Sequence, residues 1–213
     1  MADTLVINEI FYSIQGESSY AGLPCVFVRL TACHLRCAWC DTTYSFHGGT
    51  PMKIADVIVK VLEHNCPLVE ITGGEPLLQP NVLPLMTRLC DLGKRVLLET
   101  SGTVDVAPVD PRVVKIMDIK CPASGEAGKN RLANLRHLDK KDEVKFVLAD
   151  RTDYDWAKQF LAEHSIPGPV LFSPVWERLP LKDLAAWILA DKLPVRLQTQ
   201  WHKVIWGPDT KGV

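Results

Sequence analysis

Short apolar, β-branched runs recur along the whole chain and alternate with segments of helical periodicity. The runs that we expect to form strands buried on both faces are Cys25–Leu30, Leu68–Thr72, Arg95–Glu99, Val113–Asp118, Glu143–Leu148, Pro169–Phe172 and Pro194–Leu197. The segments that we expect to be helical are Met52–His64, Pro80–Leu92, Asp153–His164 and Leu181–Asp191. Strands that alternate with helices indicate parallel βα units with right-handed crossovers.

Two connections in the middle of the chain, after Glu99 and after Asp118, are rich in Gly and Pro and poorly helical. We therefore expect an α/β fold, a partial and open βα barrel with fewer helices than strands. No repeat, low-complexity tract or linker divides the chain, so residues 1–213 are expected to form a single domain. In parallel sheets of this kind, ligand sites form where the carboxyl ends of the strands meet.

Two helix starts are suggested by capping residues. Thr50 is a candidate N-cap with Pro51 in the first turn of the first helix. Thr152, with Asp155 three positions later, resembles a capping box at the start of the third helix.

Composition and charge exclude several function classes. With 24 Lys and Arg against 25 Asp and Glu, the chain has no basic excess for nucleic acid. No apolar run approaches the roughly 18 residues of a membrane span, and the start MADTLVINEI lacks the basic and apolar regions of a secretory signal, so we expect a cytoplasmic location. Three of the seven cysteines lie within eight residues, which favours metal ligation over a disulfide framework.

Cys33, Cys37 and Cys40 have the spacing C-x3-C-x2-C, directly after the first apolar run. Zinc normally takes four ligands, often from two separated C-x2-C pairs, and it would have to recruit His34, His47 or a distant cysteine here. A redox C-x2-C would need a thioredoxin-like context, which is absent from the sequence. An iron–sulfur cubane is the better interpretation, because three cysteines leave one iron open to a substrate.

This cysteine motif, with the aromatic Trp39 before its last cysteine, resembles the signature of the radical S-adenosylmethionine superfamily. Thr72–Pro76 (TGGEP) resembles the GGEP motif of the superfamily, and Glu99–Thr103 (ETSGT) resembles its ET-x-G stretch. Alone, TGGEP could be a plain turn. Together the motifs imply a [4Fe–4S] cluster whose open iron binds S-adenosylmethionine, with electron transfer that cleaves the sulfonium to a 5′-deoxyadenosyl radical.

Three further matches resemble the 7-carboxy-7-deazaguanine synthases. Glu9–Glu17 (EIFYSIQGE) is similar to the EIF-x-(S/T)-(I/L)-QGEG pattern of that family, with Ser18 in place of its usual glycine. Arg29 stands inside an apolar strand, where a guanidinium needs an anion, either a structural carboxylate or a ligand. Cys40–Thr42 matches the CDT pattern of the family. A polar surface turn remains the alternative for the first match.

The resemblance implies a role for each matching residue. The implied substrate contacts are Ile14, Gln15, Gly16, Glu17, Arg29, Thr72 and His202. The implied S-adenosylmethionine contacts are Trp39, Cys40, Asp41, Gly74, Glu75, Asp118, Ile119, Lys120, Ser173, Pro174, Val175 and Trp176. Thr42 is the implied Mg²⁺ ligand, and the ion should also keep waters and take substrate oxygens. His202 could instead be a satisfied polar residue at a strand end. Cys121 is read as a loop residue, because a fourth thiolate would block the open iron.

The resemblance also implies an activity, the conversion of 6-carboxy-5,6,7,8-tetrahydropterin to 7-carboxy-7-deazaguanine with release of ammonia, in 7-deazapurine biosynthesis of the queuosine type. The implied cofactors are a [4Fe–4S] cluster, S-adenosylmethionine and Mg²⁺. The implied partners are the pterin, an external electron donor such as flavodoxin, and a second copy in a homodimer.

Two alternatives stay open at this point. A glycyl-radical activase would share the cysteines and GGEP, but it gives no reason for EIFYSIQGE or Thr42. A non-catalytic zinc or electron-transfer module predicts four ligands and no use for Gly73–Pro76.

Overall fold

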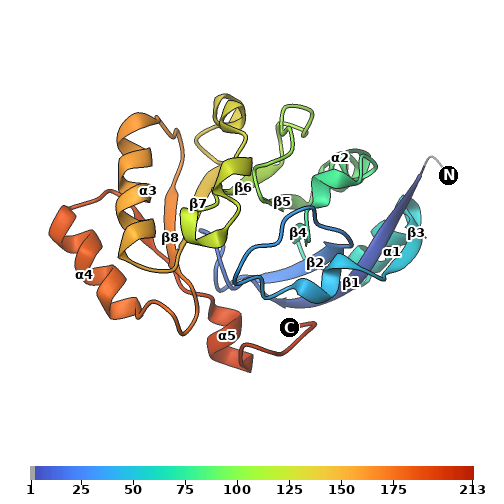
Figure 1. Ribbon diagram of the computed structural model, residues 1–213. Coiled ribbons are helices and arrows are strands. Elements are labelled where there is room, and N and C mark those ends of the chain that lie inside the picture. The colour runs from blue at the N-terminus through green and yellow to red at the C-terminus, as the bar shows by residue number, and fades with distance from the viewer. Residues whose placement is uncertain (1–2) are drawn as a thin grey trace.

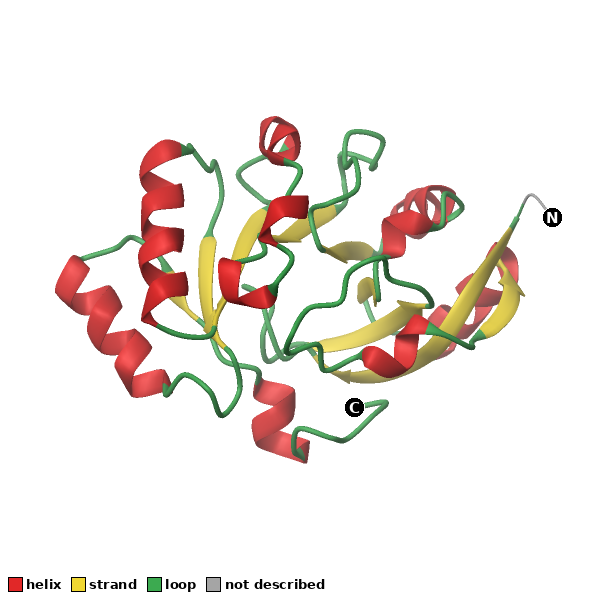
Figure 2. Ribbon diagram, viewed as in Figure 1, coloured by secondary structure: helices red, strands yellow, loops and turns green. Residues whose placement is uncertain are grey.

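The computed structural model describes residues 3–213, which build one curved sheet with helices outside it (Figures 1 and 2). The strands are β1 (Thr4–Ile14), β2 (Pro24–Leu30), β3 (Thr50–Lys53), β4 (Leu68–Gly73), β5 (Arg95–Thr100), β6 (Val114–Asp118), β7 (Glu143–Leu148), β8 (Val170–Pro174) and β9 (Arg196–Leu197). Their order in the nine-stranded sheet is β3-β1-β2-β4-β5-β6-β7-β8-β9. The strands from β2 to β9 are parallel, and the edge strands β3 and β9 do not pair with each other. The predicted open βα barrel is confirmed.

The helices are fewer than the strands, as predicted. They are α1 (Ile54–Glu63), α2 (Val82–Asp91), α3 (Arg151–Glu163), α4 (Leu181–Asp191) and α5 (Trp201–Trp206). Short 3-10 turns stand at η1 (Thr43–Phe46), η2 (Pro76–Leu78), η3 (Pro122–Ser124), η4 (Ala127–Lys129) and η5 (Leu132–His137). The Gly- and Pro-rich connections after β5 and β6 form no α-helix within the described residues. Within residues 3–213 no helix is long and apolar enough to span a membrane.

The antiparallel edge formed by β1 and β3 was not predicted. Thr50–Lys53 pairs with Thr4–Ile7, so Thr50 and Pro51 belong to a strand, and the predicted N-cap at Thr50 is wrong. Lys53 precedes the first helical residue instead. Two features hid these strands from prediction. Their pairing is long-range in the sequence, and polar residues in β1 interrupt the apolar pattern expected of a strand.

The third helix begins earlier than the capping prediction placed it. Asp150 is its N-cap, because its Oδ1 accepts a hydrogen bond from the backbone N–H of Asp153 at 3.0 Å. Thr152 lies inside the helix, and Asp155 forms an ion pair with Arg151. The predicted capping box is therefore wrong, although the helix itself is confirmed.

The segment that includes α5 bridges the gap between the two ends of the sheet. The backbone N–H of Trp201 donates to the carbonyl of Gly16 at 3.0 Å, and the backbone N–H of Ser18 donates to Oε1 of Gln198 at 2.7 Å. Residues just after β9 are thereby tied to residues just after β1. In Figure 1, α5 and the C-terminal end lie below the sheet, across its open side.

Candidate active site

A cavity of about 580 Å³ lies at the carboxyl ends of the parallel strands, as the sheet type predicts. Most of the residues implied by the resemblance line it: Ile14, Gln15, Gly16, Glu17, Arg29, Cys33, Cys37, Trp39, Cys40, Asp41, Thr42, Thr72, Gly74, Asp118, Lys120, Val175, Trp176 and His202. Segments far apart in the sequence thus meet at one site. Four implied contacts do not line this cavity: Glu75, Ile119, Ser173 and Pro174.

Glu75 has an internal role instead. Its side chain is fully buried, and its carboxylate accepts hydrogen bonds from the hydroxyl of Thr100, from the hydroxyl and backbone N–H of Ser101, and from the backbone N–H of Leu77. A carboxylate with four donors has little capacity left for a ligand. Glu75 therefore ties the loop after β4 to the end of β5, and its contact with S-adenosylmethionine stays a prediction.

Ile119, Ser173 and Pro174 are the other three residues outside the cavity. Ile119 is fully buried, and its backbone N–H donates to the carbonyl of Lys145 at 2.9 Å. Ser173 and Pro174 are buried in β8 and pair with β7. Only the residues that follow them, Val175 and Trp176, reach the cavity.

The cysteine loop follows β2 and places all three predicted thiols on the cavity. Gly74 lets this loop lie close to β4, because a Cβ there would stand 2.2 Å from the carbonyl oxygen of Ala32 and 2.7 Å from Cβ of Cys33. Burial raises the pKa of the Cys33 and Cys37 thiols, a cost that metal coordination offsets. Cys121 is buried and does not line the cavity.

The donor set fits an iron–sulfur cluster better than a single zinc ion. Within residues 3–213, no group of three or more His, Cys, Asp or Glu side chains is arranged to hold one metal ion. The three thiols line a cavity that is large enough for a cluster and an organic ligand.

Two buried polar atoms of residues that line the cavity have no hydrogen-bond partner among the described residues. They are Oδ1 of Asp118 and Nε1 of Trp176, and both residues line the cavity. The other oxygen of Asp118 accepts from Nζ of Lys120 at 2.9 Å. Because unpaired buried polar groups are costly, one free acceptor and one free donor here fit a polar organic ligand such as S-adenosylmethionine.

A second group of polar side chains, the Lys145 cluster, consists of Gln15, Glu17, Glu70, Glu99 and Lys145. Nζ of Lys145 lies 2.9 Å from Oε2 of Glu17 and also donates to Glu99. The side-chain amide of Gln15 donates to Glu70, and its Oε1 accepts from the backbone N–H of Glu17 at 3.0 Å. All five residues line the cavity, so its polar wall carries three carboxyl groups for one ammonium group.

The charges in the Lys145 cluster are unequal. Burial alone would raise the pKa of Glu17, but the neighbouring Lys145 lowers it to about 2. Burial and the nearby Glu99 raise the pKa of Glu70 to about 8, and burial raises that of Glu99 to about 7 despite Lys145. Burial works against the charge on Lys145, yet Glu17 and Glu99 hold its pKa well above the ordinary value. Glu17 is therefore an ionised acceptor at neutral pH, whereas Glu70 and Glu99 can each carry a proton, so the cluster can both accept hydrogen bonds from a nitrogen-rich ligand and donate to it.

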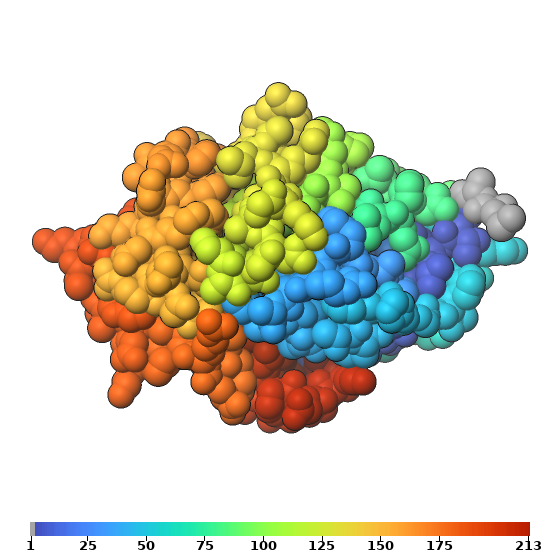
Figure 3. All heavy atoms as spheres, viewed as in Figure 1, coloured from blue at the N-terminus to red at the C-terminus, as the bar shows by residue number. Residues whose placement is uncertain are grey.

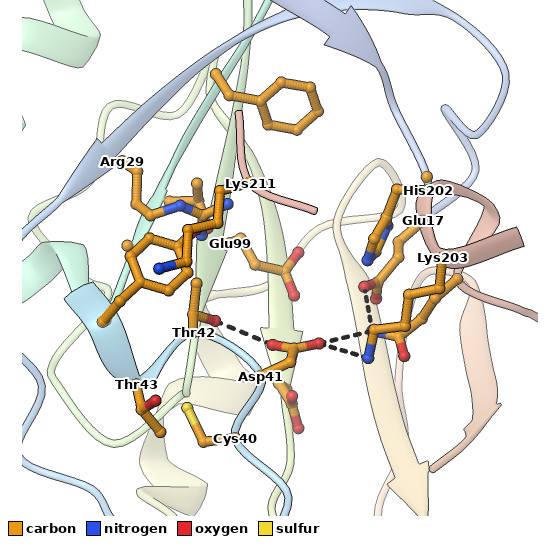
Figure 4. A pocket seen from close by; sticks show the side chains of 18 of the residues that line it. Glu17, Arg29, Cys40, Asp41, Thr42, Thr43, Glu99, His202, Lys203 and Lys211 are labelled. Atoms are coloured by element: carbon orange, nitrogen blue, oxygen red, sulfur yellow. Dashed lines mark hydrogen bonds and ion pairs between the residues drawn. The ribbon is translucent and has the colours of Figure 1, made fainter. Parts of the chain in front are cut away.

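Asp41 links the cysteine loop to α5 at the mouth of the cavity (Figure 4). Its Oδ1 accepts from the hydroxyl of Thr42 at 3.0 Å, and its Oδ2 lies 2.7 Å from Nζ of Lys203. Lost hydration would raise the pKa of Asp41, but the charge and hydrogen bond of Lys203 lower it to about 2. Adjacent hydroxyl and carboxylate oxygens suit Mg²⁺, which prefers hard oxygen ligands.

Arg29 has the structural carboxylate that was one of its two predicted partners. Its Nε lies 2.6 Å from Oε1 of Glu9, which also accepts from the hydroxyl of Tyr44 at 2.8 Å. Lys211 lies over the Tyr44 ring at 4.4 Å, and the guanidinium of Arg29 lies 5.8 Å from the same ring. The cations of Arg29 and Lys211 therefore lie near the same ring at this end of the cavity.

His202 lies in α5, not at a strand end, and packs against Gly16. A Cβ at Gly16 would stand 2.4 Å from Nδ1 of His202, so only glycine permits this contact. Burial lowers the pKa of His202, although Glu17 and Asp41 oppose the shift. Ser18 has a φ of 65°, the left-handed region that favours the glycine usual in the family pattern, and it does not line the cavity.

Sequence reasoning missed several residues of the cavity. Glu70 and Lys145 stand inside apolar strands, as Arg29 does, so the sequence could have marked them as buried charged residues but not placed them at this cavity. The stretch 208–213 also lines the cavity, and no pattern in its residues predicted that position.

Comparisons with known proteins agree with this geometry. Residues 28–118 match the family model of the radical SAM superfamily. The 7-carboxy-7-deazaguanine synthase of Koribacter versatilis is 50% identical over 97% of this chain and 99% of its own length, and that of Chlorobaculum tepidum is 50% identical over 98% and 97%. The crystal structure of QueE from Escherichia coli is 25% identical, with a TM-score of 0.78, over 92% of this chain and 94% of that one. The chain therefore belongs to the 7-carboxy-7-deazaguanine synthase family within the radical SAM superfamily.

Proposed function

We propose that this enzyme converts 6-carboxy-5,6,7,8-tetrahydropterin to 7-carboxy-7-deazaguanine and ammonia, in 7-deazapurine biosynthesis of the queuosine type. The observation that carries the proposal is that one cavity joins three cysteine thiols to the polar Lys145 cluster. The thiols suit the radical machinery, and the cluster suits a nitrogen-rich ring.

As a member of its family the enzyme uses a [4Fe–4S] cluster, S-adenosylmethionine and Mg²⁺, and it requires an external reductant. When bound, these groups supply the one-electron chemistry and a positive charge beside the substrate. Cys33, Cys37 and Cys40 hold the iron–sulfur cluster in our proposal, and Thr42 holds Mg²⁺.

The proposed S-adenosylmethionine contacts are those implied residues that line the cavity. Two of them are supported by geometry, because Asp118 has a free oxygen and Trp176 a free N–H. Gly74 supports the assignment differently, since its missing side chain leaves the backbone open to close approach. Trp39, Cys40, Asp41, Lys120 and Val175 complete the set.

The substrate lies against the Lys145 cluster in this proposal. Glu17 is held ionised by Lys145, and Glu99 lies next to it, so both can accept hydrogen bonds from the N–H groups of the pterin ring. The proposed anchor for the substrate carboxylate is the pair of cations Arg29 and Lys211. The hydrogen bond of Arg29 to Glu9 uses Nε, which leaves its terminal nitrogens for a ligand.

His202 is proposed to hold a proton during release of ammonia. Its lowered pKa keeps the imidazole neutral at neutral pH, so one ring nitrogen can accept a proton. Thr72, Ile14 and Gly16 are proposed to shape the wall around the ring. Gly16 also fixes the imidazole position, because no larger residue fits against it.

An anaerobic assay tests the proposed reaction. Protein reconstituted with iron and sulfide is given dithionite, S-adenosylmethionine, Mg²⁺ and 6-carboxytetrahydropterin, and the products are identified by mass spectrometry. We expect 7-carboxy-7-deazaguanine, abolished by Cys37→Ala. Cys121→Ala is the matched control, and it should retain product because this thiol lies outside the cavity.

The other outcomes separate the parts of the proposal. Cleavage of S-adenosylmethionine without the expected product would reject the substrate. Loss of product in Cys121→Ala but not in Cys37→Ala would reject the assignment of the cluster ligands.

We also propose that residues 1–213 act as one domain, that the enzyme works in the cytoplasm and that it is a homodimer. The dimer follows from the family resemblance alone. Light scattering on the purified protein tests it, and a monomer at working concentration would reject it.

A further inference from the structure

We propose that Gln200 and Lys203 are positioning residues that hold the pterin-binding carboxylate and the magnesium-binding hydroxyl in a fixed arrangement across the cavity. These two residues, the α5 brace, stand at the start of α5, and both line the cavity. The resemblance implies a role for the neighbouring His202 but none for either of them. The inference rests on the proposed function, because it concerns how the same site binds the pterin and Mg²⁺.

The side-chain amide of Gln200 joins two carboxylates from different parts of the cavity. Its Nε2 donates to Oε1 of Glu17 at 3.0 Å and to Oδ2 of Asp41 at 3.3 Å. Glu17 belongs to the Lys145 cluster, and Asp41 follows the last cysteine of the cysteine loop. An amide nitrogen carries two hydrogens, so it can donate one to each carboxylate. A single side chain therefore connects the proposed pterin half of the cavity with the proposed magnesium half.

On the pterin side, the brace completes the hydrogen bonds that fix Glu17. Oε2 of Glu17 accepts from Nζ of Lys145 at 2.9 Å and from Nε2 of Gln198 at 3.2 Å, and its Oε1 accepts from Gln200. A carboxylate offers about four acceptor positions. The three donors set the direction of the position that is left on Oε1, which is the one available to an N–H group of the pterin.

On the magnesium side, the brace acts through Asp41 (Figure 4). Oδ2 of Asp41 lies 2.7 Å from Nζ of the almost fully buried Lys203, and its Oδ1 accepts the hydroxyl hydrogen of Thr42 at 3.0 Å. Because that hydrogen points to Asp41, the lone pairs of the Thr42 oxygen are free for a cation. Mg²⁺ demands a near-octahedral arrangement of its ligands, so a carboxylate that orients this hydroxyl also favours binding of the ion.

The backbone anchors the brace to the loop after β1. The backbone N–H of Trp201 donates to the carbonyl of Gly16 at 3.0 Å, and the backbone N–H of Lys203 donates to the carbonyl of Gln200 at 3.0 Å. Both brace residues thus lie on a single turn, and that turn is fastened to the loop that carries Glu17. In Figure 3 the red spheres near the C-terminus lie directly against the blue spheres of the first quarter of the chain. A shift of this turn would move both carboxylates together.

Three substitutions separate the contacts of the brace. Gln200→Leu removes the donor to both carboxylates. Gln198→Leu removes a donor to Glu17 and leaves Asp41 untouched, whereas Lys203→Met removes the ion pair of Asp41 and leaves Glu17 untouched. Gln200→Asn is a second variant at the bridging position, because it keeps a polar amide on a side chain too short to span the two carboxylates.

Two binding constants are measured anaerobically on the full chain, reconstituted with iron and sulfide and loaded with S-adenosylmethionine, but without a reductant, so that no turnover occurs. The first is the Kd for 6-carboxytetrahydropterin at saturating Mg²⁺. The second is the Mg²⁺ concentration for half-maximal pterin binding, with pterin well above the Kd of each variant. The matched control is Gln159→Leu, which removes an exposed amide that donates to Glu163 on α3, outside the cavity.

We expect Gln200→Leu to weaken pterin binding and to raise the Mg²⁺ requirement, each on the order of tenfold. Gln200→Asn should move both constants in the same directions. Gln198→Leu should weaken pterin binding with the Mg²⁺ requirement unchanged, and Lys203→Met should raise the Mg²⁺ requirement more than it weakens pterin binding. Gln159→Leu should change neither constant.

Unchanged constants in the folded Gln200 variants would overturn the proposal. So would a rise in the Mg²⁺ requirement with Gln198→Leu as large as that with Gln200→Leu, because a general loosening of the cavity would then explain both. Wild-type protein that binds no pterin at saturating Mg²⁺ would reject the proposed function and the brace together. Tight wild-type binding that the Gln200 variants leave unchanged would reject the brace alone.

Discussion

Two buried lysines on neighbouring strands differ in their acidic partners and in whether those partners line the cavity. Nζ of Lys115 on β6 lies 2.9 Å from Oδ2 of Asp142, and both side chains are almost fully buried. Asp142 also accepts from the backbone N–H groups of Lys115 and Asp139, and from Nζ of Lys141. Lys145 on β7 instead meets two carboxylates, with a third beside them, at a cavity.

The two sites differ in whether every carboxylate oxygen has a hydrogen-bond donor within the chain. The Lys115–Asp142 pair is closed, because every oxygen of the carboxylate has a donor within the chain. The Lys145 cluster has more carboxyl groups than cations, and burial together with the neighbouring carboxylates raises the pKa of Glu70 and Glu99. A closed buried pair is part of the fold, whereas titratable groups with strongly shifted pKa values at a cavity mark the place of a ligand.

The largest effect is expected on stability, from a substitution that breaks the Lys115–Asp142 pair. Lys115→Met would leave Asp142 buried with Lys141 as its remaining cation, and should lower the free energy of unfolding by about 3 kcal/mol. Urea unfolding measures this change. The folded fraction should keep normal activity at low temperature, because Lys115 does not line the cavity. Lost activity in fully folded protein would contradict the distinction between the two lysines.

Lys145→Met should act mainly on turnover. Glu17 and Glu99 would lose the cation that positions them, and kcat/KM for the pterin should fall on the order of a hundredfold, the value of one or two charged hydrogen bonds. Steady-state kinetics measure it. Cleavage of S-adenosylmethionine without pterin is the internal control, and it should persist because the cysteine loop is unchanged.

Glu70→Gln should alter the pH dependence of stability. The folded-state pKa of Glu70 is about 8 against an ordinary 4.5, so the folded protein binds this proton more tightly than the unfolded chain does. Stability should therefore fall as pH rises from 4.5 to 8, by about 1 kcal/mol per pH unit for this group. The variant should show a shallower fall in urea midpoints across that window. An unchanged slope would show that Glu70 is ionised throughout.

Ser18→Gly should have the smallest effect. Glycine relieves the positive φ but loses the hydrogen bond from the backbone N–H of Tyr20 to the Ser18 hydroxyl, so stability should change by no more than about 0.5 kcal/mol. KM for the pterin should stay the same, because Ser18 lies beside the Lys145 cluster but outside the cavity. A several-fold change in KM would place Ser18 in the binding machinery after all.

The parallel strands could be predicted because each is a local apolar run. β1 and β3 could not, since their pairing joins Thr4–Ile7 to Thr50–Lys53 across most of the first fifty residues. The cysteine motif and the EIFYSIQGE segment led to most of the cavity through their resemblance to family patterns. Glu70 and Lys145 needed the fold, because only the sheet register turns them to the same cavity as Glu17.

Glu75 has a consequence for how sequences of this kind are interpreted and engineered. Its carboxylate holds the loop after β4 to the end of β5, so a substitution there would first damage the local fold. Loss of activity in a Glu75 variant would therefore not be evidence of cofactor contact by itself. Variant surveys should therefore score Glu75 with the folding residues, and redesign of cofactor specificity should leave it untouched.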